Sequence, residues 1–203
     1  MRKLILSTAA LALMSGAALA QETVRLGTEG AYPPYNYLDD NGEVAGYERE
    51  LGDAICAQAE LTCEWVTNDW DSIIPNLVSG NYDVIIAGMS ITDERDEVID
   101  FTEAYFPADP SAFISTSDAF DGTGEADAVL ADKAFLEPIV AESGGELVFA
   151  GEDVILGDGI GIGVRESDGE LKDKLNAAIA ALKADGTVNT LIEKWFEGME
   201  GPY

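Results

Sequence analysis

The amino-acid sequence predicts an α/β fold. Short apolar runs rich in β-branched residues, such as Val84 to Ala87, have the length and composition of buried strands. They alternate along the chain with longer segments, such as Glu170 to Ala184, in which apolar residues recur at helical spacing. This alternation is typical of a sheet covered by helices. With 203 residues, the chain is long enough for one large domain or two small lobes.

Residues 1–20 are expected to be a secretory signal peptide rather than part of the fold. Arg2 and Lys3 form a basic start, Leu4 to Leu13 is mostly apolar, and Ala18 to Ala20 provides small residues at a cleavage site. A transmembrane anchor is the weaker alternative, because the apolar stretch is short and polar residues interrupt it. We therefore expect cleavage after Ala20 and export of the remaining chain.

Composition excludes several classes of function. The chain has 11 basic and 39 acidic residues, a formal net charge of −28, so a nucleic-acid partner is not expected, because phosphate binding needs a basic face. It contains no histidine, which removes Ser-His-Asp and Cys-His nucleophiles and imidazole metal ligands. No cofactor and no metal site are expected.

The two cysteines, Cys56 and Cys63, are predicted to form a disulfide, because they lie close together in an exported chain. Their spacing is not the C-x-x-C of redox enzymes.

The first third of the chain is predicted to form a strand from Thr23 to Thr28, then an aromatic, turn-rich loop with tandem prolines. The turn-forming run Asp39 to Gly42 predicts a hairpin. A helix is expected from Gly46 to about Gln58, since its apolar residues fall on one side.

A strand from Cys63 to Val66 and a helix from Asp71 to Gly80 should follow, with Trp70 in the loop before the helix. Pro75 lies near the first turn of that helix, where proline is tolerated. The strand Val84 to Ala87 comes next.

The second half is predicted from the same patterns. Its expected elements are strands at Ala112–Ser115 and Asp127–Ala131, a helix at Lys133–Ser143, strands at Glu146–Ala150 and Ile160–Val164, the amphipathic helix Glu170–Ala184, and a last helix after Gly186.

The segment from Asp83 to Thr102 carries the strongest chemical signal. Its strand ends in Gly88 and is followed by the hydroxyl of Ser90 and the guanidinium of Arg95. A guanidinium can bind a carboxylate through two parallel hydrogen bonds, and a hydroxyl can complete its shell. Alternatively, Thr92 caps a short helix and Arg95 pairs with a neighbouring acid, namely Asp96, Asp100 or Glu103.

This segment resembles the AGMSIT-x-ER-x-x-x-x-DF-(S/T) signature of periplasmic amino-acid-binding proteins, the solute-binding protein family 3 of ATP-driven (ABC) importers. The resemblance implies the two-lobe, type II periplasmic-binding-protein-like fold. It also implies that Arg95 holds the α-carboxylate of the ligand, and that Gly88 and Ser90 line the same pocket.

Further segments support the resemblance. The TEGAYPPYNY opening is similar to that of the family, in which the position of Tyr32 stacks on the ligand side chain and an acid at Glu29 occurs in receptors for basic amino acids. The resemblance makes Trp70 the second side of an aromatic clamp. Asp132, in DAVLAD, is expected to accept the α-ammonium, although it could also cap the helix that follows. LKADGT followed by IEKWF is similar to the family's C-terminal signature.

The sequence departs from the family in one place. Between Thr123 and Ala126 the family has a further strand, a Gly-Thr loop that opens a helix, and another strand and helix, all of which are missing here. The resemblance therefore implies a lobe 1 of residues 22–112 and 162–203 and a shortened lobe 2 of residues 113–161.

The expected function is that of a periplasmic receptor, not an enzyme. It should capture a polar or basic amino acid such as arginine between its lobes and deliver it, as a monomer, to an inner-membrane ABC permease. Two alternatives stay open: a deletion variant with impaired binding, and a dehydratase-like enzyme on the same fold. For the enzyme, Glu29 and Asp132 are the candidate acid and base. A sensory role cannot be separated from transport by sequence.

Overall fold

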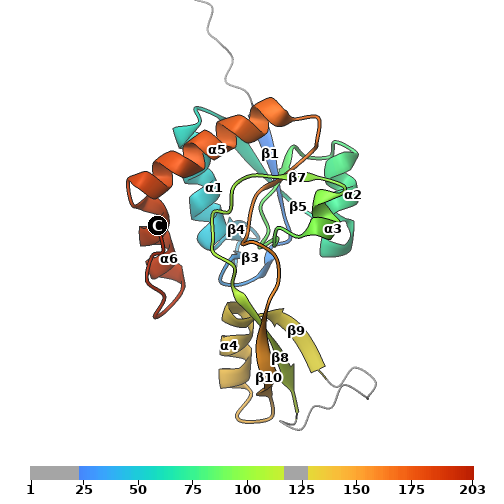
Figure 1. Cartoon of the computed structure of the whole chain (residues 1–203), viewed down its shortest axis with the longest axis vertical. Helices are drawn as coiled ribbons and strands as arrows, with labels where there is room; N and C mark the ends of the chain where they lie inside the picture. Colours follow the sequence, from blue (N-terminus) through green and yellow to red (C-terminus); the bar gives the residue numbers. More distant parts are fainter. Residues whose placement is uncertain (1–22, 117–127) are drawn as a thin grey trace, which may run out of the picture.

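The computed structural model describes residues 23–116 and 128–203 (Figure 1). The expected signal peptide, and the point between Thr123 and Ala126 where the family has an additional segment, lie outside the described residues. Figure 1 shows a larger lobe and a smaller lobe, joined by the chain segments that lead into β8 and out of β10.

The larger lobe is built on a five-stranded sheet with the order β5-β1-β6-β11-β7. Its strands are β1 (Thr23–Thr28), β5 (Thr62–Thr67), β6 (Val84–Ile85), β7 (Asp100–Phe101) and β11 (Gly163–Val164). The strands β5, β1 and β6 are parallel, and β11 is antiparallel to both of its neighbours. The parallel strands end at one edge of the sheet, where ligands of such sheets bind.

Helices cover both faces of this sheet. Those of the larger lobe are α1 (Tyr47–Gln58), the short 3-10 helix η1 (Trp70–Ser72), α2 (Ile73–Val78), α3 (Asp93–Asp96), α5 (Gly169–Ala184) and α6 (Thr187–Trp195). Side chains alternate between the faces of a strand, so Val84 and Ile86 join the core under α1, α5 and α6. Ile85 and Ala87 join the separate core under α2.

A small hairpin sheet lies beside this lobe, formed by β2 (Ala31–Tyr32), β3 (Asn36–Leu38) and β4 (Val44–Ala45). It contains the predicted turn, in which Asp39 accepts hydrogen bonds from the backbone N–H groups of Asn41 and Glu43.

In the smaller lobe, the described residues form a three-stranded antiparallel sheet in the order β10-β8-β9, with one helix packed against it. The elements are β8 (Pro110–Ser115), β9 (Ala128–Asp132), α4 (Lys133–Glu142) and β10 (Val148–Ile155). Its core is small and contains Ala112, Ile114 and Leu136.

The predicted disulfide is confirmed, and it ties α1 to β5 through Cys56 and Cys63, with 6.3 Å between their Cα atoms. Over the described residues, no helix is both long enough and apolar enough to cross a membrane.

Several predicted boundaries are wrong. The strand expected at Glu146–Ala150 runs from Val148 to Ile155, because an irregularity after Ala150 lets pairing with β8 resume at Val154. The strand expected at Ile160–Val164 is limited to β11, and Ile160 only forms isolated bridges, to Ser90 and Phe106.

The strand expected at Val84–Ala87 is also shorter than predicted and ends at Ile85. Trp70 is not in a loop, because it opens η1.

Candidate functional site

A pocket of about 440 Å³ lies between the two lobes, at the carboxyl end of the parallel strands. All of the ligand-binding residues expected from the sequence line it: Glu29, Tyr32, Trp70, Gly88, Ser90, Arg95 and Asp132. Its volume falls in the range of small-molecule sites. Thr92, Ser111, Leu130, Phe135 and Leu156 also line it.

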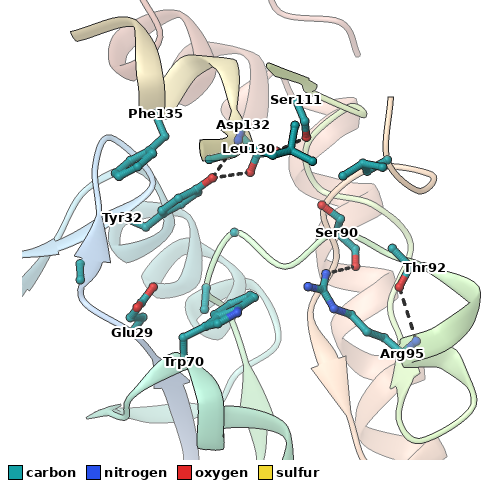
Figure 2. A pocket seen from close by; sticks show the side chains of 15 residues that line it. Glu29, Tyr32, Trp70, Ser90, Thr92, Arg95, Ser111, Leu130, Asp132 and Phe135 are labelled. Atoms are coloured by element: carbon teal, nitrogen blue, oxygen red, sulfur yellow. Dashed lines mark hydrogen bonds between the residues drawn. The ribbon is translucent and has the colours of Figure 1, made fainter. Parts of the chain in front are cut away.

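Figure 2 shows that the polar side chains gather in three places around the pocket. Asp132 and Tyr32 face each other on one side, with Ser111 close to Asp132. The guanidinium of Arg95 lies on another side, next to Ser90. Glu29 and Trp70 occupy the third, away from Asp132.

Arg95 presents a guanidinium that is only partly engaged. Its Nη1 donates a hydrogen bond to the backbone oxygen of Ser90 at 2.8 Å. Within the described residues it forms no ion pair, and burial lowers its pKa, although the charges of Asp132 and Glu94 oppose that shift. Its remaining N–H groups are therefore available to an anion in the pocket.

The alternative interpretation of Arg95 is half correct. Thr92 does cap α3, since its side chain accepts a hydrogen bond from the backbone N–H of Arg95. The expected pairing of Arg95 with Asp96, Asp100 or Glu103 is absent from the described structure, because the Arg95 side chain turns toward the pocket while Lys172 takes Asp100.

Trp70 contacts Arg95 directly. The Arg95 Cζ atom lies over the indole ring, 5.4 Å from its centroid, a distance typical of cation–π contacts. Trp70 also lines the pocket, so the indole lies beside both the guanidinium and the space that a ligand would occupy.

Asp132 is held by two hydroxyl groups. Its Oδ2 accepts a hydrogen bond from the Tyr32 hydroxyl at 2.8 Å, and its Oδ1 accepts one from Ser111 at 3.3 Å. Asp132 stands at the N-cap position of α4, as one alternative predicted, but its side chain makes no capping bond. Burial raises the pKa of Asp132. The hydrogen bonds from the two hydroxyls offset only part of this rise.

The ring of Tyr32 is already stacked on a protein side chain. Phe135, on the first turn of α4, lies parallel to it, with 4.3 Å between the ring centroids and 19° between the planes. One face of the ring that the resemblance assigns to the ligand side chain is therefore covered by lobe 2.

Glu29 supplies negative potential at the end of the pocket away from Asp132. Burial raises its pKa, and the charges of Asp69 and Asp71 raise it further. Three acids close together favour a cation among them. Over the described residues there is no cluster of acids, cysteines and histidines that could hold a metal ion.

The sequence did not indicate Ser111 or Phe135. Ser111 enters the site because it is paired with Asp132 in the register of β8 and β9, and strand pairing is not visible in a single sequence. Phe135 follows Asp132 by three residues, a helical spacing that could have suggested a shared side of α4.

Comparison with known proteins gives a consistent result. Residues 24–198 match the family model described as bacterial extracellular solute-binding proteins, family 3. The chain is 32% identical to the L-arginine-binding protein of Pseudomonas aeruginosa, over 87% of this chain and 89% of that protein. It is 30% identical to the lysine/arginine/ornithine-binding periplasmic protein of Escherichia coli K12, over 97% and 98% of the two chains.

A solved structure is also similar. It is a periplasmic His/Glu/Gln/Arg/opine family-binding protein from Silicibacter pomeroyi in complex with lysine, 56% identical, with a TM-score of 0.85 over 89% of this chain and 100% of that one. The alignment with the Pseudomonas protein extends over 230 residues, more than the 203 of this chain, so the relative has residues without counterpart here.

Proposed function

The chain belongs to the bacterial extracellular solute-binding proteins of family 3, and we propose that it is a receptor that binds one amino acid in the pocket between its lobes. The observation that carries the proposal is that a cationic group and an anionic group both line that pocket. The partly free guanidinium of Arg95 and the oriented carboxylate of Asp132 both line it, and an α-amino acid carries the two complementary charges.

In this proposal Arg95 binds the α-carboxylate and Asp132 accepts the α-ammonium. Ser90 and Gly88, in the turn after β6, contribute hydroxyl and backbone groups beside the same end of the ligand. Charge-assisted hydrogen bonds of this kind are about twice as strong as neutral ones, so they can anchor every α-amino acid alike.

The side chain of the ligand would extend toward Trp70 and Glu29. The negative potential of Glu29, Asp69 and Asp71 favours a basic side chain, lysine or arginine. The names of the relatives, which bind arginine, lysine or ornithine, support the same preference.

The shortened lobe 2 supplies enough of the site for binding. Its three strands and α4 provide Asp132, Ser111 and Phe135, and the hydroxyls that orient Asp132 come from described residues. We take the lobes to be residues 22–112 with 162–203, and residues 113–161. In this proposal lobe 2 closes on the ligand by a hinge motion.

The family membership and the sequence of residues 1–20 support the remaining parts of the proposal. The receptor would work in the periplasm after removal of residues 1–20, as a monomer, and would dock transiently on an ABC permease. It would not be an enzyme.

Calorimetric titration of the protein with arginine, lysine, histidine, glutamine and glutamate tests the proposal. We expect saturable binding of one ligand per chain, with arginine and lysine ahead of glutamine and glutamate. A folded protein that binds none of the five would contradict the proposal and favour the binding-impaired variant. Conversion of prephenate-type substrates to aromatic product would instead identify a dehydratase.

A further inference from the structure

Glu48 is a carboxyl group in the centre of the larger lobe. It is the second residue of α1, it is 0% exposed, and it does not line the pocket. Within the described residues no basic side chain forms an ion pair with it. A buried acid without a cation is costly unless hydrogen bonds satisfy it.

Three donors converge on its two oxygens. Oε1 accepts the backbone N–H of Gly88 at 2.6 Å and also the hydroxyl of Tyr105. Oε2 accepts the side-chain amide of Asn36 at 2.7 Å. A peptide N–H and an amide NH₂ can only donate, so both oxygens act as acceptors. Burial raises the pKa of Glu48, and the three hydrogen bonds oppose that shift.

Each donor belongs to a different segment around the pocket. Gly88 lines the pocket directly, in the turn between β6 and Ser90. Asn36 links Glu48 to the next segment. Its Oδ1 accepts a hydrogen bond from the N–H of Gly30 at 2.8 Å, which fixes the turn between Glu29 and Tyr32. Tyr105 lies in the segment that leads from β7 toward lobe 2.

We propose that Glu48 is a positioning residue for the ligand site, which fixes the Gly88 peptide and the Glu29–Tyr32 turn relative to each other. The binding part of this proposal rests on the proposed function. Glu48 touches no ligand itself and acts through the backbone that does.

The conformation of Gly88 makes the position sensitive. Its φ is +64°, a region that favours glycine, and a Cβ there would lie 3.1 Å from a ring carbon of Tyr32. In a trans peptide the N–H and the preceding C=O point in opposite directions. The bond to Glu48 therefore also sets the direction of the carbonyl of Ala87, a residue that lines the pocket.

Glutamine cannot replace Glu48 without conflict. Its amide keeps one acceptor oxygen but turns an NH₂ donor toward either Gly88 or Asn36. Asn36 cannot flip to accept, because its oxygen already serves Gly30. The substitution preserves shape and volume, so its effect isolates the hydrogen-bond pattern.

The test compares Glu48→Gln with the parent by two readouts. The first is the NMR resonance of the Gly88 amide proton, which a short bond to a carboxylate shifts downfield. The second is the affinity for lysine by calorimetry. The matched control is Asp83→Asn, which removes a carboxylate bonded to Arg25 and Arg165 and lies outside the pocket.

We expect Glu48→Gln to move the Gly88 amide resonance upfield. It should also weaken lysine binding about tenfold or more, because the Gly88 peptide and the Glu29–Tyr32 turn would no longer be held in the geometry that the ligand needs. Asp83→Asn should lower the thermal midpoint but leave both readouts unchanged. If Glu48→Gln leaves the Gly88 resonance in place, or weakens binding no more than Asp83→Asn does, the proposal is wrong.

If the parent binds no amino acid, the proposed function fails, yet the Gly88 resonance still decides whether Glu48 fixes that peptide. If Glu48→Gln does not fold, the parent decides alone: its Gly88 amide proton must resonate downfield and exchange slowly with solvent, and a fast-exchanging, unshifted proton would overturn the proposal.

Discussion

The hydroxyl of Tyr32 donates a hydrogen bond to the carboxylate of Asp132 at 2.8 Å, across a sequence separation of 100 residues. The same hydroxyl accepts the backbone N–H of Asp132 at 3.1 Å. Tyr32 belongs to the hairpin sheet of the larger lobe and Asp132 ends β9 of the smaller one. A single phenol therefore both joins the lobes and orients the group that we assign to the ligand ammonium.

Tyr32→Phe keeps the ring against Phe135 and removes only this hydroxyl. We expect arginine to bind roughly tenfold more weakly, because a hydrogen bond to a charged group contributes about 1.5–3 kcal/mol. The loss should vanish for 5-guanidinopentanoate, which is arginine without its α-ammonium. Calorimetry with both ligands measures the difference.

The matched control is Tyr37→Phe, whose hydroxyl makes no hydrogen bond within the described residues and whose ring packs edge-on against Trp195. It should leave both affinities unchanged. Equal weakening of both ligands by Tyr32→Phe would mean that the hydroxyl does not act through Asp132.

Glu29→Gln tests the origin of the side-chain preference. Removing this charge should reduce the preference for arginine over glutamine about tenfold, since it removes a partly buried partner for the guanidinium. Burial raises the pKa of Glu29 above its usual 4.5, so the parent's preference should decline on acidification at a higher pH than for an exposed glutamate.

Asp40→Asn serves as control, because it removes the same charge from an exposed position on the hairpin turn. The ratio of the arginine and glutamine affinities is the quantity to follow, since protonation of Asp132 affects both ligands. An unchanged ratio in Glu29→Gln would assign the preference to other groups.

Asp132→Asn should stabilise the ligand-free protein while abolishing binding. Burial raises the pKa of Asp132 above 3.8, so the folded state holds the proton more tightly than the unfolded state does. The ionised carboxylate therefore destabilises the folded protein. This destabilisation is absent below pH 3.8, where the carboxyl is protonated in both states, and reaches its full size above the pKa of the folded state. At pH 7 the variant should melt at a higher temperature than the parent, and the gap should narrow on acidification.

Asp83→Asn should have the opposite effect on stability and lower the thermal midpoint at pH 7. Burial alone would raise the pKa of Asp83, but hydrogen bonds from Arg25 and Arg165 lower it, so its charge stabilises the fold at pH 7. Thermal unfolding of both variants from pH 3 to 7 measures the two signs. A lower midpoint for Asp132→Asn at pH 7 would show that its carboxylate is not the costly group described here.

Local patterns predicted much of the fold. The predicted strand Thr23–Thr28 matches β1 at both ends. The helix α1 ends at Gln58 as predicted and begins one residue after Gly46, because a glycine turn and one apolar face mark this helix clearly. The predicted strand ends at Ala150, five residues before the end of β10. Gly151 and two acids interrupt the apolar pattern there, although pairing with β8 continues beyond them. Pairing partners decide such boundaries, and a sequence does not display them.

In the site too, local sequence patterns could be predicted and contacts between distant segments could not. The presence of Arg95, Gly88 and Ser90 at the pocket could be predicted because they follow one strand within a few residues and match the signature of the family. The contact of Arg95 with Trp70, and the orientation of Asp132 by Tyr32 and Ser111, join segments far apart in the chain. Only the folded arrangement brings them together.

Binding of the ligand carboxylate by Arg95 can be measured by comparing the affinity of the protein for arginine with its affinity for agmatine, which is arginine without its α-carboxylate. If Arg95 binds that carboxylate, the parent should bind arginine at least 100-fold more tightly, the order expected for losing a partner of a desolvated charge. Arg95→Ala should lose most of this preference, because only the Ser90 hydroxyl and the backbone at Gly88 remain beside the carboxylate. If the parent binds agmatine as tightly as arginine, or if Arg95→Ala keeps the full preference for arginine, Arg95 does not bind the α-carboxylate.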